Sequence, residues 1–146
     1  WQSCALKPGV YGLSNGALDT PWPKTRALKT ALRQALDSDR QEDLQAGLWS
    51  ALQDRKRPSD EHLPRTGVPL ALERALSSVF VDFPEHAYGT RSSTVLVARA
   101  EESVSPEVTW DIVIDEITHP HAPRHGLLRK SDSRCQLIWQ QGRTSL

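Results

Sequence analysis

The residues that could support chemistry gather in two short segments. The first, GLSNGALDTPWPK at 12–24, carries Ser14, Asn15 and Trp22 among several turn-forming residues. An Asn directly before a rigid turn can aim its side-chain N–H₂ at an oxyanion that develops during acyl transfer. Asn15 is therefore a candidate catalytic residue, and Ser14 and Trp22 are candidate ligand-binding residues beside it.

The same segment also has a purely structural interpretation. Asn15-Gly16 predicts a turn with positive φ, and Asp19 or Thr20 predicts a cap for a following helix. Trp22 is then expected to be largely buried at a sheet edge. The residues alone leave both interpretations open.

The second segment, YGTRSSTV at 88–95, contains Arg91 just before a predicted strand. A fixed guanidinium there could lower the pKa of a cysteine thiol or bind a carboxylate or phosphate. Alternatively, Arg91 bonds loop carbonyls and holds the start of the strand. Small polar neighbours leave room for a ligand, which makes Thr90 and Ser92 candidate ligand-binding residues. We expect Asn15 and Arg91 to line one pocket.

Histidine and cysteine spacing predicts neither a metal site nor another cofactor. His119, His121 and His125 lie in a proline-containing segment with no Cys or carboxylate at the usual ligand spacing. Cys4 and Cys135 are too few for a disulfide framework, and we expect two unpaired thiols in a reducing compartment. The sequence therefore favours a cytoplasmic protein without a metal.

Composition excludes two classes of partner. The 146 residues include 18 basic and 18 acidic side chains, and the longest basic run is RKR at 55–57. A nucleic-acid-binding protein would carry a larger basic patch. No apolar run approaches the roughly 20 residues that span a membrane. The first residue is Trp1 and the chain contains no Met, so we expect an upstream segment that is missing here.

The hydrophobic periodicity predicts three helices followed by an antiparallel strand pair, an α+β class. The helices are expected at 23–36, after the capping-box-like DRQE at 39–42, and over PLALERALSSVF at 69–80. The β-branched segments 92–99 and 108–117 predict the strands, and CQLIWQ at 135–140 could form a third. TVLV and IVI within these strands suggest burial on both faces, so we expect the missing segment to supply further strands.

Three motifs in order carry a resemblance to a known family. GLSNGALDTPWPK, LPRTGVP at 63–69 and YGTRSSTVLV at 88–97 resemble the C-terminal portion of the NRDE family, also called the transport and Golgi organisation family. The Asn-Arg-Asp-Glu motif that names the family, and the Cys after its initiator Met, are not in this sequence. Cys4 is not that cysteine, because it stands just before GLSN. LPRTGVP itself is interpreted as architecture.

The family resembles N-terminal nucleophile hydrolases, which have a layered α-β-β-α fold. This implies that residues 1–146 are the C-terminal part of a single domain, a partial four-layer structure whose N-terminal strands and Cys lie outside this chain. It also implies a cysteine-type amide hydrolase with an upstream nucleophile. The alternative is a non-catalytic protein that handles haem, acyl-lipid or acyl-CoA, with His86 or His125 as the plausible haem ligands in this chain. Either function implies a small-molecule ligand as the partner.

Overall fold

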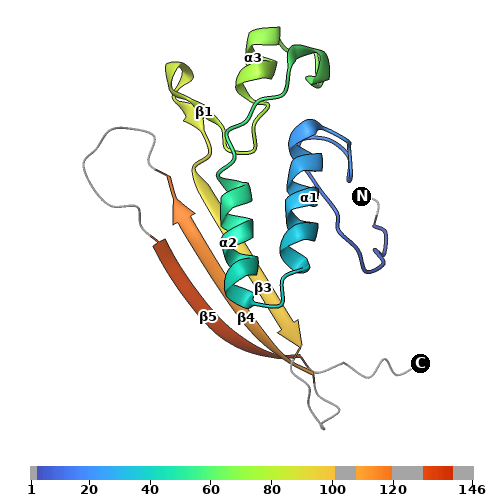
Figure 1. Cartoon of the computed structure of the whole chain (residues 1–146), viewed down its shortest axis with the longest axis vertical. Helices are drawn as coiled ribbons and strands as arrows, with labels where there is room; N and C mark the ends of the chain where they lie inside the picture. The colour runs from blue at the N-terminus through green and yellow to red at the C-terminus, as the bar shows by residue number, and fades with distance from the viewer. Residues whose placement is uncertain (1–2, 101–107, 120–129, 140–146) are drawn as a thin grey trace. The chain divides into compact units, whose positions relative to one another are not determined.

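The computed structural model describes residues 3–100, 108–119 and 130–139 and has the α+β class predicted from the sequence. It divides into two compact units, residues 1–90 and residues 91–146. The first unit contains the helices and a two-stranded ribbon, and the second contains a three-stranded sheet (Figure 1). The α-β-β-α layering remains a prediction.

Helix α1 covers Pro23–Leu36, the range predicted from its apolar stripe. Pro23 stands at its first position, where the missing N–H leaves no intrahelical hydrogen bond unmade. The N-cap is Trp22, and no side chain caps the helix. The prediction that Asp19 or Thr20 caps α1 is therefore wrong, because the chain reaches the helix through two further residues after Thr20.

Helix α2 covers Gln41–Leu52 and follows α1 after a short turn. Its N-cap is Arg40, which makes no side-chain cap, so the capping box expected from Asp39 and Glu42 does not form. Glu42 instead forms an ion pair with Arg40. The predicted helix is confirmed, but its start lies one residue later than the capping motif suggested.

Helices α1 and α2 form an antiparallel hairpin in the first unit (Figure 1). Gly47 of α2 faces Ala35 of α1 so closely that a Cβ on Gly47 would stand 3.3 Å from the Ala35 Cβ. Ala35 is buried, as are Leu63, Ala75 and Phe80. These four side chains belong to the apolar core of this unit.

Helix α3 covers only Leu70–Ala75, whereas the sequence predicted a helix as far as Phe80. Ser77 and Ser78 explain the early end, because their hydroxyls bond nearby carbonyls. Ser77 Oγ donates to the Arg74 carbonyl at 2.8 Å, and Ser78 Oγ donates to the Phe80 carbonyl at 2.6 Å. Such local hydrogen bonds compete with helix continuation.

Short elements complete the first unit. Two 3₁₀ helices cover Asp60–His62 (η1) and Pro84–His86 (η2). Strand β1 (Asp82–Phe83) pairs antiparallel with β2 (Tyr88–Gly89).

The second unit is an antiparallel sheet in the order β3-β4-β5. Its strands are Ser92–Ala100 (β3), Val108–Thr118 (β4) and Lys130–Trp139 (β5). The predicted pairing of the first two strands is confirmed, and the segment around CQLIWQ is a strand that begins earlier than expected. Exposure alternates along β3, with Val95 6% and Leu96 60% exposed. Leu96 is therefore exposed in this chain, and its burial by strands of a missing segment remains a prediction.

Candidate ligand-binding cavity

The loop that carries Asn15 is closed at its base by Gly12 and Asp19. The Asp19 N–H donates to the Gly12 carbonyl at 2.7 Å, and the Gly12 N–H donates to Asp19 Oδ1, also at 2.7 Å. Lys29 Nζ of α1 lies 2.6 Å from the same carboxylate oxygen. The hydrogen bond from Lys29, followed by that from Gly12, lowers the pKa of Asp19 below its ordinary value.

Asp19 is also the residue with positive φ in this loop, at 61°. The sequence placed the positive φ at Asn15-Gly16, and that prediction is wrong. Asp is among the non-glycine residues that tolerate this conformation, and here its carboxylate also accepts hydrogen bonds from the loop base and from α1. The loop is thus fixed to α1 at the residue where it turns.

A cavity of about 220 Å³ lies in the first unit, bordered by this loop, the start of α1, the segment 64–68 and the region of α3. Its polar lining residues are Asn15, Lys24, Thr66, Glu73 and Ser77, and its apolar lining residues are Trp22, Pro23, Pro64, Val68 and Leu76. The cavity therefore brings together two of the residues predicted from the first motif, Asn15 and Trp22. It pairs an apolar wall with several convergent polar groups, the usual character of a small-molecule site.

Trp22 and Lys24 form one side of the cavity. The Lys24 ammonium lies 5.8 Å from the centroid of the Trp22 ring, within the range of a cation–π interaction. Trp22 is half-buried and not largely buried as predicted, because one side of its ring borders the cavity. Lys24 Nζ donates to the carbonyl of Leu76 at 3.2 Å, which ties the start of α1 to the end of α3.

Glu73 of α3 supplies a buried carboxylate on another side. It is 8% exposed, and its Oε1 accepts hydrogen bonds from the Thr66 N–H at 2.6 Å and from the Thr66 hydroxyl. Burial lowers the pKa of Lys24, and the charge of Glu73 partly opposes that shift. A half-buried amine and a buried carboxylate thus line the same small cavity.

Sequence reasoning missed Lys24, Glu73 and the residues of the 64–68 segment as site residues. LPRTGVP was interpreted as architecture, yet Pro64, Thr66 and Val68 line the cavity. Lys24 follows the PWP turn directly, which was a usable signal because a charged side chain beside a rigid turn has a fixed position. Nothing in the sequence around Glu73 marks it among the other charged residues of its helix.

The remaining predicted site residues lie apart from the lining of this cavity. Ser14 is half-buried in the loop. Thr90 is engaged with Val81, since its Oγ1 accepts from the Val81 N–H and its own N–H donates to the Val81 carbonyl, both at 2.9 Å. Arg91 and Ser92 are exposed at the start of the second unit, where the Arg91 carbonyl accepts from the His119 N–H at 2.7 Å. A pocket shared by Asn15 and Arg91 remains a prediction.

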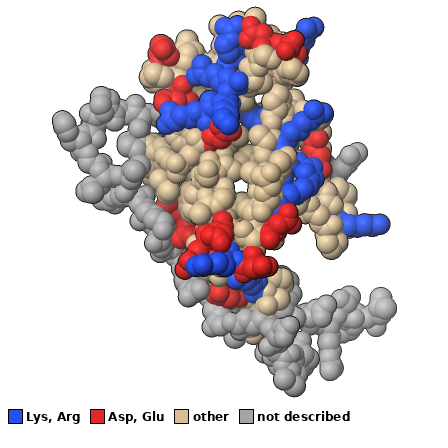
Figure 2. Space-filling model, in the orientation of Figure 1, with Lys and Arg blue, Asp and Glu red and all other residues tan. Residues whose placement is uncertain are grey.

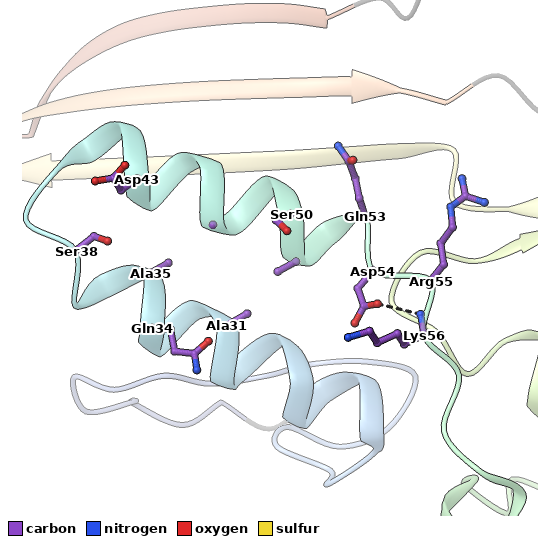
Figure 3. A pocket seen from close by; sticks show the side chains of 12 residues that line it. Ala31, Gln34, Ala35, Ser38, Asp43, Ser50, Gln53, Asp54, Arg55 and Lys56 are labelled. Carbon is purple, nitrogen blue, oxygen red and sulfur yellow. Dashed lines mark hydrogen bonds between the residues drawn. The ribbon is translucent and has the colours of Figure 1, made fainter.

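A larger hollow of about 740 Å³ lies between α1, α2 and residues 53–56 (Figure 3). Gln34, Ser38, Ser50 and Asp54 border it, and the Lys56 N–H donates to the Asp54 carboxylate at 2.9 Å. Arg55 extends away from Asp54 (Figure 3). It forms an ion pair with Asp82 at 2.5 Å. This groove is wide and polar, so it encloses a small ligand less well than the cavity at Trp22.

Charged groups, metal-binding groups and the lengths of the helices add further findings about the described part of the chain. Basic and acidic side chains lie interspersed on the visible face (Figure 2). Among residues 3–100, 108–119 and 130–139, no three His, Cys, Asp or Glu side chains come together as a metal site. His121 and His125 lie outside the described residues, and Cys4 is an exposed free thiol. No helix in the described part is long and apolar enough to cross a membrane.

Comparison with known proteins identifies the family. The family model for Transport and Golgi organisation 2 matches residues 2–109. This chain belongs to that family. It is 35% identical over 107 residues to the Transport and Golgi organization protein 2 homolog of Bos taurus, a match that covers 68% of this chain. No solved structure matches the chain significantly.

The family match confirms the resemblance stated from the three motifs. All three lie inside the matched range, which begins before GLSNGALDTPWPK and ends after YGTRSSTVLV. The matched region is 38% of the length of the bovine relative. The activity of a whole Transport and Golgi organisation 2 protein is therefore addressed below as a proposal.

Proposed function

We propose that this chain contributes the ligand-binding part of a Transport and Golgi organisation 2 protein that handles small acyl compounds without cleaving them. The observation that carries the proposal is the cavity in which Asn15 and Lys24 face an apolar wall that includes Trp22. An acyl carbonyl can accept a hydrogen bond from the Asn15 amide or the Lys24 amine, and a short acyl chain can lie against the ring and the proline side chains. The ligand that we propose is therefore a carbonyl compound of modest size.

The size of the cavity favours an acyl group over haem. Its volume of about 220 Å³ is below the roughly 300–1,000 Å³ typical of sites for drug-sized ligands. His86, one of the two histidines considered as haem ligands, is exposed and has its ring 4.3 Å from that of Phe83. We therefore propose an acyl compound as the ligand and a cytoplasmic location, as the unpaired thiol of Cys4 favours.

Amide or thioester hydrolysis is the second candidate function, and Asn15 favours it. Its amide lines a cavity that can hold a carbonyl, as an oxyanion donor must. The nucleophile would be a cysteine outside this chain. In a longer protein that includes this cysteine, Asn15→Ala should lower turnover by about 100-fold or more.

Calorimetric titration of the 146-residue chain with butyryl-N-acetylcysteamine, a small acyl thioester, tests the first proposal. We expect binding that Asn15→Ala weakens by about 3- to 10-fold, the effect of one lost hydrogen bond. Trp22→Leu should weaken binding as well, because the aromatic wall is lost. Gln53→Ala in the groove of Figure 3 is the matched control and should leave the affinity unchanged.

Two outcomes would contradict the proposal. Equal affinities for the wild type and the Asn15 and Trp22 variants would place the ligand elsewhere. Multiple-turnover release of N-acetylcysteamine, beyond the single acyl transfer that a free thiol such as Cys4 can undergo, would show that this chain hydrolyses thioesters.

A further inference from the structure

Lys24 has different surroundings from the other lysines whose side chains the structure describes. Lys29 forms an ion pair with the Asp19 carboxylate at 2.6 Å. Lys7 and Lys56 are exposed to water. Lys24 is half-buried in a cavity, where its Nζ has a carbonyl, an aromatic ring and a carboxylate nearby.

Burial in the cavity favours the neutral amine with its free lone pair, whereas the ring, the carbonyl and the carboxylate favour the ammonium form. The Leu76 carbonyl at 3.2 Å accepts one N–H bond, and a neutral amine can still donate that bond. Burial lowers the pKa of Lys24, while the charge of Glu73 on α3 raises it and limits the shift. The Glu73 Oε1 already accepts two hydrogen bonds from Thr66. The carboxylate therefore interacts with the 64–68 segment as well as with the charge of Lys24.

The cavity also has the features that a carbonyl compound needs beside an amine. Asn15 can donate a hydrogen bond to a carbonyl oxygen, and Trp22, Val68 and Leu76 offer an apolar surface for the attached group. Desolvation of a lysine in such a pocket is one of the ways in which proteins activate an amine nucleophile.

We propose that Lys24 is a nucleophilic lysine that forms a Schiff base with small apolar aldehydes entering the Trp22 cavity. The Nζ lone pair attacks the carbonyl carbon to give a carbinolamine. The carbonyl oxygen then leaves as water with the two protons that the amine gives up, and a C=N bond replaces the C=O bond. No oxidant or second substrate takes part. The inference rests on the same cavity as the proposed acyl binding and adds a covalent step to it.

Reductive trapping tests this step. The 146-residue chain is incubated with benzaldehyde and sodium cyanoborohydride at about pH 7.5, and peptide mass spectrometry measures the benzylation rate of each lysine. We expect Lys24 to react at least about threefold faster than Lys7 or Lys56, because burial lowers the pKa of Lys24 and the cavity retains the probe. A rate at Lys24 equal to or below that of these exposed lysines would overturn the proposal.

Two variants separate reactivity from mere accessibility. Glu73→Gln keeps an oxygen acceptor for Thr66 but removes the negative charge that raises the Lys24 pKa, so benzylation of Lys24 should become faster at about pH 7.5. A slower reaction in a folded Glu73→Gln variant would contradict the assigned cause. Lys24→Arg keeps the charge and should abolish labelling at position 24 without changing the rates at Lys7 and Lys56.

The trapping result and the titration with the acyl thioester can fail separately. Thioester binding at the cavity with no preferential benzylation would remove only the Schiff-base step. Rapid benzylation of Lys24 with no thioester binding would remove the acyl-handling proposal and leave the reactive lysine standing.

Discussion

The two units use polar side chains in opposite ways. In the first unit, groups from distant parts of the sequence converge on one cavity, as Lys24, Thr66 and Glu73 do. In the second unit, polar side chains of β3 pair with residues in β4 or directly after it, as Thr94 does with Glu116 at 2.9 Å and Ser93 with His119 at 3.0 Å. Pairs of polar side chains across neighbouring strands stabilise a sheet. Polar side chains that converge around a cavity can instead bind a ligand.

The largest expected effect contrasts a buried carboxylate of the cavity with a carboxylate of the sheet. Glu73→Ala should lower the free energy of unfolding by about 2–3 kcal/mol, because the Thr66 N–H and hydroxyl lose an ionised acceptor inside the protein. Glu116→Ala, whose Thr94 partner is exposed, should cost less than about 0.5 kcal/mol. Urea denaturation measures both. Similar losses for the two variants would remove the distinction between the units.

A smaller effect is expected where the Asn15 loop meets α1. A Cβ on Gly12 would stand 2.5 Å from Thr25 Cγ2, so Gly12→Ala should destabilise the protein by about 1–3 kcal/mol through overpacking. Thr25→Ser removes that methyl group, and the double variant should recover much of the loss in thermal unfolding. If Gly12→Ala were as stable as the wild type, the loop would be less firmly seated on α1 than the contact indicates.

The smallest effect concerns acid stability and involves Asp19. Its pKa in the folded protein lies below the ordinary 3.8, so the carboxylate's contribution is complete above that pH and is lost as the pH falls through the folded pKa. Asp19→Asn should therefore lose less stability than the wild type as the pH falls below 3.8. Unfolding measured from about pH 6 to about pH 2 shows the difference, and parallel curves would contradict it.

Local sequence signals predicted the elements better than their ends. Pro23 and the apolar stripe behind it predicted α1 with its exact bounds, and β-branched residues predicted β3 and β4. The end of α3 was missed because Ser77 and Ser78 bond their own backbone, which an apolar period does not reveal. Helical spacing of apolar residues indicates which side chains face a core. It does not indicate where serine hydroxyls bond the backbone and end the helix.

The candidate site was predicted in part, for a related reason. Asn15 and Trp22 were found because their turn residues are neighbours in the sequence. Lys24 and Glu73 become neighbours only when α3 comes beside the start of α1, and no local pattern specifies that contact. Tertiary packing therefore brings Lys24 and Glu73 to the cavity, and local sequence patterns do not reveal it.

The closed base at Gly12 and Asp19 has a practical consequence for protein engineering. A segment whose two ends are bonded to each other can be lengthened at its tip while its ends stay in place, and each doubling of loop length costs only about 0.6 kcal/mol. Residues inserted after Gly16 would shift the Asn15 amide relative to Lys24 without changing any side chain of the cavity. Such insertions would measure how precisely the amide must be positioned, which a substitution that deletes it does not reveal.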